Sequence, residues 1–182
     1  MGRWIPLIFF SWSACGIEVG ADGEGDAYIA RVRESFLAFN PRAELGLVLR
    51  GYPWFEKRTW SFATENGVPT VTFVGVVDDA KAVADFEARN KYRWRDAFKS
   101  MQLQAAYPLT RDKRKLSFAI HFAFEDDARN FKIAGGTLGV QRESDGVWVY
   151  ETLEQRELDA LIEGLFGRQD PYLILVRGLP YK

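Results

Sequence analysis

The strongest structural signal in the sequence is a nine-residue stretch, 116–124, in which large apolar side chains alternate with small or polar ones. Phe118 and Phe122 belong to the apolar set, and Ala119 and His121 belong to the other. A period of two residues is typical of a β-strand that buries one of its faces. The alternation therefore predicts a strand with its aromatic residues in the core and His121 on the opposite face.

Two dipeptides predict tight turns in an antiparallel sheet around this strand. Asn66-Gly67 separates two alternating runs, and Asp145-Gly146 precedes a run rich in valine and aromatic residues. Asn-Gly and Asp-Gly favour two-residue hairpins because these residues tolerate the positive φ angles that such turns require. The polar stretch 125–130 is expected to turn the strand at 116–124 back into a partner strand. An antiparallel sheet is the simplest arrangement of these elements.

Four stretches show the apolar spacing of amphipathic helices. They cover residues 26–39, residues 42–51, a segment from about Ala80 onward, and a stripe from Leu158 to Phe166. Proline, glycine and aspartate residues near their ends agree with helix start and stop signals. We therefore expect one α+β domain over residues 26–182, with an antiparallel sheet of four to six strands. Two N-terminal helices, an inserted helix and a C-terminal helix are expected to pack against this sheet.

Charge and cysteine content exclude several classes of protein. The 182 residues include 24 basic and 25 acidic side chains, which gives a formal charge of −1 with the single histidine neutral. Nucleic-acid binding requires a net or clustered positive field, so nucleic acid is not expected as a partner. One cysteine excludes an internal disulfide framework and any cluster of cysteine metal ligands. Neither a metal nor a cofactor is predicted.

The N-terminus has the layout of an export signal. Arg3 precedes an apolar run of roughly ten residues, about half of the ~20 that a membrane-spanning helix needs. Cleavage before Cys15 would leave a lipidated cysteine, as in bacterial lipoproteins, although Trp12 stands where such signals usually carry an aliphatic residue. Cleavage after Ala21 would leave an unmodified chain. Residues 1–21 are thus predicted to be a signal and tether that exports the protein to the periplasm or outer membrane. The alternative is a buried N-terminal strand or helix of a cytoplasmic protein.

Several motifs resemble those of a group of exported bacterial sequences. They are a short helix ending near Tyr52-Pro53, the Trp60-Ser61-Phe62 strand, the Glu65-Asn66-Gly67 turn, the Val71-Thr72-Phe73-Val74-Gly75 strand and the alternation described above. The chain is similar in these motifs to uncharacterised exported bacterial proteins and lipoproteins. The likeness covers the larger part of the mature chain, and residues 78–115 depart from it. It implies export and a small α+β fold, and it carries over no catalytic residue.

Basic and aromatic residues interleave in one segment, which is the candidate interaction surface. Arginine and aromatic side chains together dominate the energetics of many interfaces. The solvated face of an amphipathic helix is the alternative interpretation. In an exported protein such a surface would contact a protein, an acidic polymer or an anionic lipid. The surface comprises Tyr92, Arg93, Trp94, Arg95, Phe98 and Lys99.

His121, the only histidine, is the candidate general base or metal ligand. No Gly-x-Ser-x-Gly or His-Glu-x-x-His motif accompanies it, so a histidine that is satisfied within the fold or faces solvent is the favoured interpretation. The polar turn 125–130 carries oxygen ligands without the spacing of an EF-hand loop. Gly135-Gly136 is not followed by the Lys-Ser/Thr of a phosphate loop, and it predicts a β-bulge.

These observations predict a non-enzymatic, exported and lipid-anchored binding or accessory protein of the cell envelope. Its partner would be an unknown protein or envelope component, and the lipid on Cys15 would contact the membrane. Two alternatives stay open. One is a cup, formed by the curved sheet and the helices, that holds a small hydrophobic ligand. The other is a hydrolase that uses His121 with a carboxylate.

Overall fold

The structure is a computed structural model that describes residues 23–90, 115–125, 129–141, 145–172 and 174. Its helices are α1 (Gly23–Arg33), α2 (Leu45–Gly51), α3 (Asp79–Asn90) and α6 (Gln155–Phe166). Its strands are the short pair β1 (Phe36–Leu37) and β2 (Asn40–Glu44), and the set β3 (Phe55–Glu65), β4 (Val68–Val77), β5 (Leu116–Phe124), β6 (Phe131–Gln141) and β7 (Trp148–Thr152).

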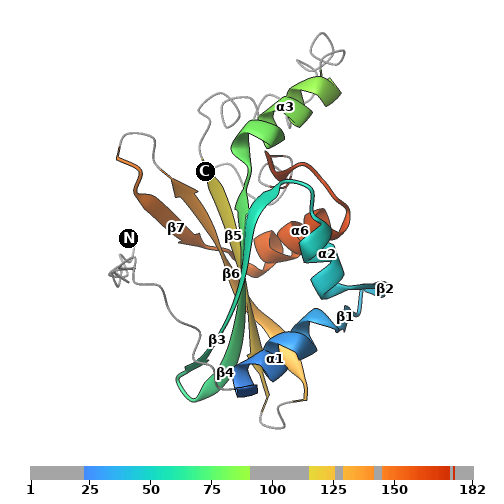
Figure 1. Ribbon diagram of the computed structural model, residues 1–182, viewed down its shortest axis with the longest axis vertical. Coiled ribbons are helices and arrows are strands. Elements are labelled where there is room, and N and C mark those ends of the chain that lie inside the picture. Colours follow the sequence, from blue (N-terminus) through green and yellow to red (C-terminus); the bar gives the residue numbers. More distant parts are fainter. Residues whose placement is uncertain (1–22, 91–114, 126–128, 142–144, 173, 175–182) are drawn as a thin grey trace, which may run out of the picture.

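One five-stranded sheet forms the centre of the fold. Its strand order is β3-β4-β5-β6-β7, and every neighbouring pair is antiparallel. Figure 1 shows α1, α2 and α6 on one side of this sheet, while α3 follows β4 at the upper end. The predicted α+β fold, with helices packed on an antiparallel sheet, is therefore confirmed. The side of the sheet opposite α1, α2 and α6 is called the open face below.

The two-residue period of the strands divides the sheet into a buried face and the open face. In β5, Phe118 and Phe122 are at most 1% exposed and belong to the core, whereas His121 lies on the open face, as predicted. The turn between β3 and β4 contains Asn66 and Gly67, whose φ angles are 53° and 82°. These positive angles are those of the predicted two-residue hairpin.

A β-bulge bends β6 beside the glycine pair that predicted it. His121 of β5 is paired with Gly135, whereas the next residue, Phe122, is paired with Ile133. Ala134 is therefore the extra residue on β6. A bulge of this kind increases the local twist of a sheet.

The first helix is shorter than predicted. α1 ends at Arg33, whereas the apolar spacing predicted a helix through Phe39. The Ser35 hydroxyl donates a hydrogen bond to the carbonyl of Val32 at 2.7 Å, and β1 and β2 form a hairpin where the last helical turns were expected. Phe36 and Phe39 are each 55% exposed on this hairpin. Half of the predicted apolar stripe thus lies outside the core.

Two other boundaries of the N-terminal helices differ from the prediction. α2 begins at Leu45, because residues 42–44 belong to β2 and not to the predicted helix over 42–51. α1 begins at Gly23, three residues before the predicted start of the helix at residue 26. Gly46 lets α2 approach the end of α1 closely, since a Cβ there would lie 2.7 Å from the carbonyl oxygen of Arg33.

Candidate functional site

Three predicted features lie outside the described residues. Cys15 and both cleavage sites belong to residues 1–22, and the candidate interaction surface at 92–99 lies within residues 91–114. The roles predicted for these features therefore rest on the sequence alone. The candidate site in the described part of the chain is the centre of the open face.

His121 lies at the centre of the open face and pairs with a hydroxyl group across the sheet. Thr72 of β4 and Gly135 of β6 are the residues opposite His121 on its two neighbouring strands. Thr72 Oγ1 and His121 Nδ1 are 3.0 Å apart, which is hydrogen-bonding distance. Within the described residues this is the one hydrogen bond that the His121 side chain makes.

The environment of His121 favours its neutral form. Burial lowers the pKa of His121 below its usual value, and the negative charge of Glu65 opposes this effect. A neutral imidazole can accept a proton, and Thr72 carries a hydroxyl within its reach. A histidine base also needs a third group that orients its ring. The hydrolase hypothesis assigns that role to a carboxylate, but the hydrogen bond of His121 goes to Thr72, and Glu65 acts only through its charge.

A substitution at His121 provides a pH-dependent test of this environment. We expect His121→Asn to remove a part of the stability that depends on pH. Because burial lowers the folded-state pKa, the unfolded chain binds the proton more readily, and wild-type stability falls as the pH drops through the usual histidine range. Urea denaturation from about pH 8 to about pH 5 should show the wild type losing more stability than the variant. Parallel losses in both proteins would contradict the buried, neutral imidazole.

Two aromatic residues border the open face on the edge strand β7. The rings of Trp148 and Tyr150 are stacked, with centroids 6.2 Å apart and planes inclined by 20°. The Tyr150 ring covers Gly139 of β6, where a Cβ would lie 2.8 Å from it. Burial raises the pKa of Tyr150, yet this residue is still 53% exposed. Aromatic rings at the protein surface are enriched at protein interfaces.

A second group of polar side chains is buried where α3 meets the C-terminal residues. Tyr172 donates a hydrogen bond from its hydroxyl to Asp79 Oδ1 at 2.8 Å, and Trp54 Nε1 donates one to Asp85 Oδ2 at 3.0 Å. Asp170 accepts a hydrogen bond from the backbone N–H of Tyr172 at 2.9 Å. Burial raises the pKa of Asp79 and also that of Tyr172. These contacts fasten α3 to Trp54, just before β3, and to Tyr172 near the C-terminus.

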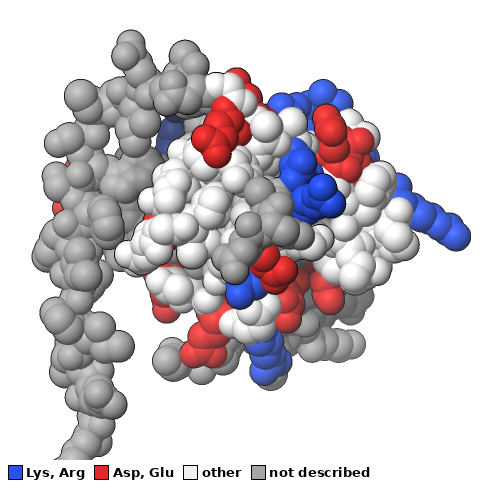
Figure 2. Space-filling model, turned by 90° about the horizontal axis from the view of Figure 1, so that it is seen from below, with Lys and Arg blue, Asp and Glu red and all other residues white. Residues whose placement is uncertain are grey.

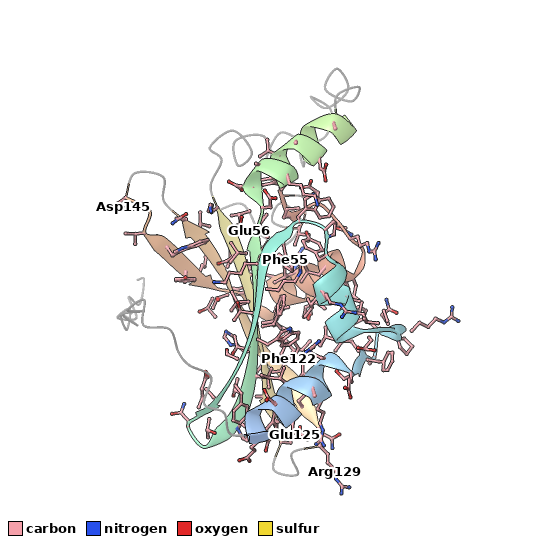
Figure 3. The ribbon with its side chains drawn as sticks, viewed as in Figure 1. Phe55, Glu56, Phe122, Glu125, Arg129 and Asp145 are labelled. Atoms are coloured by element: carbon pink, nitrogen blue, oxygen red, sulfur yellow. The ribbon has the colours of Figure 1, made fainter. Side chains whose placement is uncertain are left out.

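Only the two ends of the polar turn between β5 and β6 lie within the described residues. The backbone N–H of Glu125 donates a hydrogen bond to the carbonyl of Asn130 at 3.0 Å. Figure 3 places Glu125 and Arg129 at the lower end of the sheet and Asp145 at the tip of the β6–β7 hairpin. In the part of the chain that the structure describes, no three His, Cys, Asp or Glu residues are grouped as metal ligands.

Aromatic rings fill the space between the sheet and the helices. Phe55 lies 4.6 Å from Tyr52 and 5.7 Å from Phe73, measured between ring centroids. Trp60 lies 4.9 Å from Phe73 and 6.3 Å from Phe122. Figure 3 shows Phe55 and Phe122 inside the molecule, facing the helices. The rings that a ligand cup would use as its lining therefore pack against one another.

The charged residues at the lower end of the molecule are mixed in sign. Figure 2 views this end and shows acidic and basic side chains interspersed around uncharged surface.

Comparisons of the chain with protein-family models, with curated proteins and with solved structures found no match in any of the three.

Proposed function

We propose that this chain is an exported, lipid-tethered and non-enzymatic binding or accessory protein of the bacterial cell envelope. The proposal combines the N-terminal signal pattern with one structural observation. The buried face of the sheet is occupied by helices and aromatic rings, while the exposed Tyr150 and the half-buried Trp148 lie on the opposite side, at the edge strand β7. Exposed rings on a rigid strand suit contact with a partner.

The polar groups of the described residues support a binding role better than a catalytic one. His121 is hydrogen-bonded to Thr72, and the hydrogen bonds of Asp79 and Tyr172 hold elements of the fold together. Each of these groups has a structural partner that accounts for its position. None of the described helices is long and apolar enough to cross a membrane.

The tether is tested by the mass of the mature protein. We expect the protein from the membrane fraction of an expressing bacterium to begin at Cys15 and to carry the mass of a diacylglyceryl group and an N-acyl chain, because two or more chains give stable anchoring. Cys15→Ala should abolish this added mass and prevent cleavage before position 15. Intact-mass spectrometry of wild type and variant measures both effects.

Two other masses would overturn parts of the proposal. A full-length chain in the cytoplasm would refute export, and an unmodified chain that begins after Ala21 would refute the lipid tether but keep export. Cys15→Ser serves as a second variant, since serine retains the size of the side chain and lacks the thiol.

A further inference from the structure

The edge strand β7 has exposed apolar side chains along most of its length. Val149 is 50% exposed and Tyr150 is 53% exposed, and Val147, just before the strand, is 48% exposed. Glu151 is the only charged residue in the strand Trp148–Thr152. An exposed apolar edge strand is a template for pairing with another strand.

The other edge of the sheet, β3, has several features that prevent such pairing. Its first residues form a bulge between Phe55 and Lys57, and it carries the charged series Glu56, Lys57 and Arg58. The helix α1 also packs against β3, where Gly25 lies against Phe62. Bulges, charges and covering helices are the usual protection of an edge strand. The described part of β7 has no bulge and carries no lysine or proline.

Alternate residues of β7 also direct their backbone hydrogen-bonding groups to the outer side of the strand. The N–H of Leu153 donates to the carbonyl of Gly136 on β6 at 2.9 Å, which identifies these two residues as a hydrogen-bonded pair. Such pairs alternate along an antiparallel ladder. The N–H and C=O groups of Trp148, Tyr150 and Thr152 must therefore point away from β6.

We propose that β7 is the interface of a homodimer, in which a second copy of the chain pairs with it in antiparallel orientation. Two antiparallel copies of one strand are related by a two-fold axis perpendicular to the sheet, which is the commonest oligomer symmetry. The two sheets then form one continuous ten-stranded sheet, because each copy contributes five strands. Both open faces lie on the same side of that sheet.

Charge selects the register of this pairing. With Val149 on the axis, Trp148 faces the partner's Tyr150, and the two Glu151 carboxylates are about 13 Å apart along the strand, beyond the Debye length at physiological salt. With Tyr150 on the axis the same carboxylates would be only about 7 Å apart, and with Glu151 on the axis they would face each other directly. If the two-fold axis passed through a residue before Val149, much of β7 would have no partner strand.

The register with Val149 on the axis also places aromatic residues opposite aromatic residues. Trp148 and Tyr150 stand on either side of Val149, so the two-fold axis brings the stacked pair of one copy beside that of the other. The four rings then form one aromatic cluster on the open side. Val149 meets the partner's Val149 in the close type of antiparallel pair, with Cα atoms about 4.5 Å apart.

Oligomeric state tests the interface. The full chain carrying Cys15→Ser, which has neither lipid nor thiol, should sediment in density-matched detergent at twice the monomer mass at micromolar concentration. Tyr150→Pro should be monomeric, because proline removes an outward N–H while the ladder to β6 keeps its hydrogen bonds. Tyr150→Phe is the matched control and should stay dimeric. A monomeric parent chain, or a dimer that persists in Tyr150→Pro, overturns the proposal.

A cross-linking experiment tests the register and does not depend on the proline variant. Val149→Cys in the Cys15→Ser chain should form a disulfide-linked dimer on mild oxidation, because the two sulfurs meet at the axis. Glu151→Cys should not cross-link, since its partner cysteine would lie far beyond the Cα separation of about 7 Å that a disulfide can bridge. Equal cross-linking of both variants, or none at Val149→Cys, contradicts this register. Neither readout depends on export or lipidation, so a failure here leaves the proposed function untouched.

Discussion

Replacing Trp54 with alanine is expected to lower the free energy of unfolding by about 3–5 kcal/mol. Trp54 is fully buried and contacts the Tyr52 ring edge-on, with centroids 5.2 Å apart. Its Nε1 donates the hydrogen bond to Asp85 that attaches α3 to the start of β3. The substitution thus removes a large side chain from the core and, with it, one link between α3 and the sheet. Urea denaturation followed by circular dichroism measures the loss.

Two further variants separate the contributions at Trp54. Trp54→Phe keeps a ring in the core but removes the indole donor, and it should cost clearly less than the alanine variant. Leu47→Ala on the adjacent α2 is the control, because Leu47 is 50% exposed and its loss should change stability by about 0.5 kcal/mol or less. A Trp54→Ala protein as stable as Leu47→Ala would show that Trp54 does not occupy the core.

The strands of the sheet could be predicted because their signals are local. The alternation over 116–124 assigns each side chain of β5 to a face, and the Asn66-Gly67 pair determines where β3 turns into β4. The glycine pair at 135–136 likewise indicated the bulge in β6. Each of these features depends on residues that are neighbours in the chain.

The end of α1 could not be predicted in this way. Ile29, Val32 and Phe36 have helical spacing, but the chain leaves the helix before Phe36. The backbone N–H of Leu45 donates a hydrogen bond to the carbonyl of Ser35 at 2.9 Å, so a residue ten positions later takes part in the change of direction. Tertiary contacts of this kind override local propensity.

The candidate site shows the same division between local and long-range information. The alternation of β5 placed His121 on the open face, but its partner Thr72 is 49 residues away and is defined only by the register of β4 and β5. The hydrogen bond between Asp79 and Tyr172 spans 93 residues. No short motif marks either pair, because each arises from two strands or segments that meet only in the folded chain.

Gly75→Ala is expected to destabilise the protein by about 1–3 kcal/mol, although a glycine within a strand is usually replaced at little cost. A Cβ at Gly75 would lie 2.5 Å from the Phe55 ring, which is closer than real Cβ contacts allow. Phe55 is 4% exposed and packs against Tyr52 and Phe73, and the Arg58 guanidinium lies over its ring. The ring therefore has little room to move away. Thermal or urea denaturation measures the cost.

Gly135→Ala is the matched control, because Gly135 lies in the same sheet and a Cβ there would meet no atom within 4 Å. This variant should be neutral, or stabilising by up to about 1 kcal/mol through the lower entropy of its unfolded chain. Phe55→Leu should recover part of the loss when it is combined with Gly75→Ala, since the smaller side chain vacates the space that the methyl group needs. The coupling in this double-mutant cycle identifies the Phe55 ring as the source of the clash. Simple additivity of the two changes would contradict the close approach of β4 to Phe55.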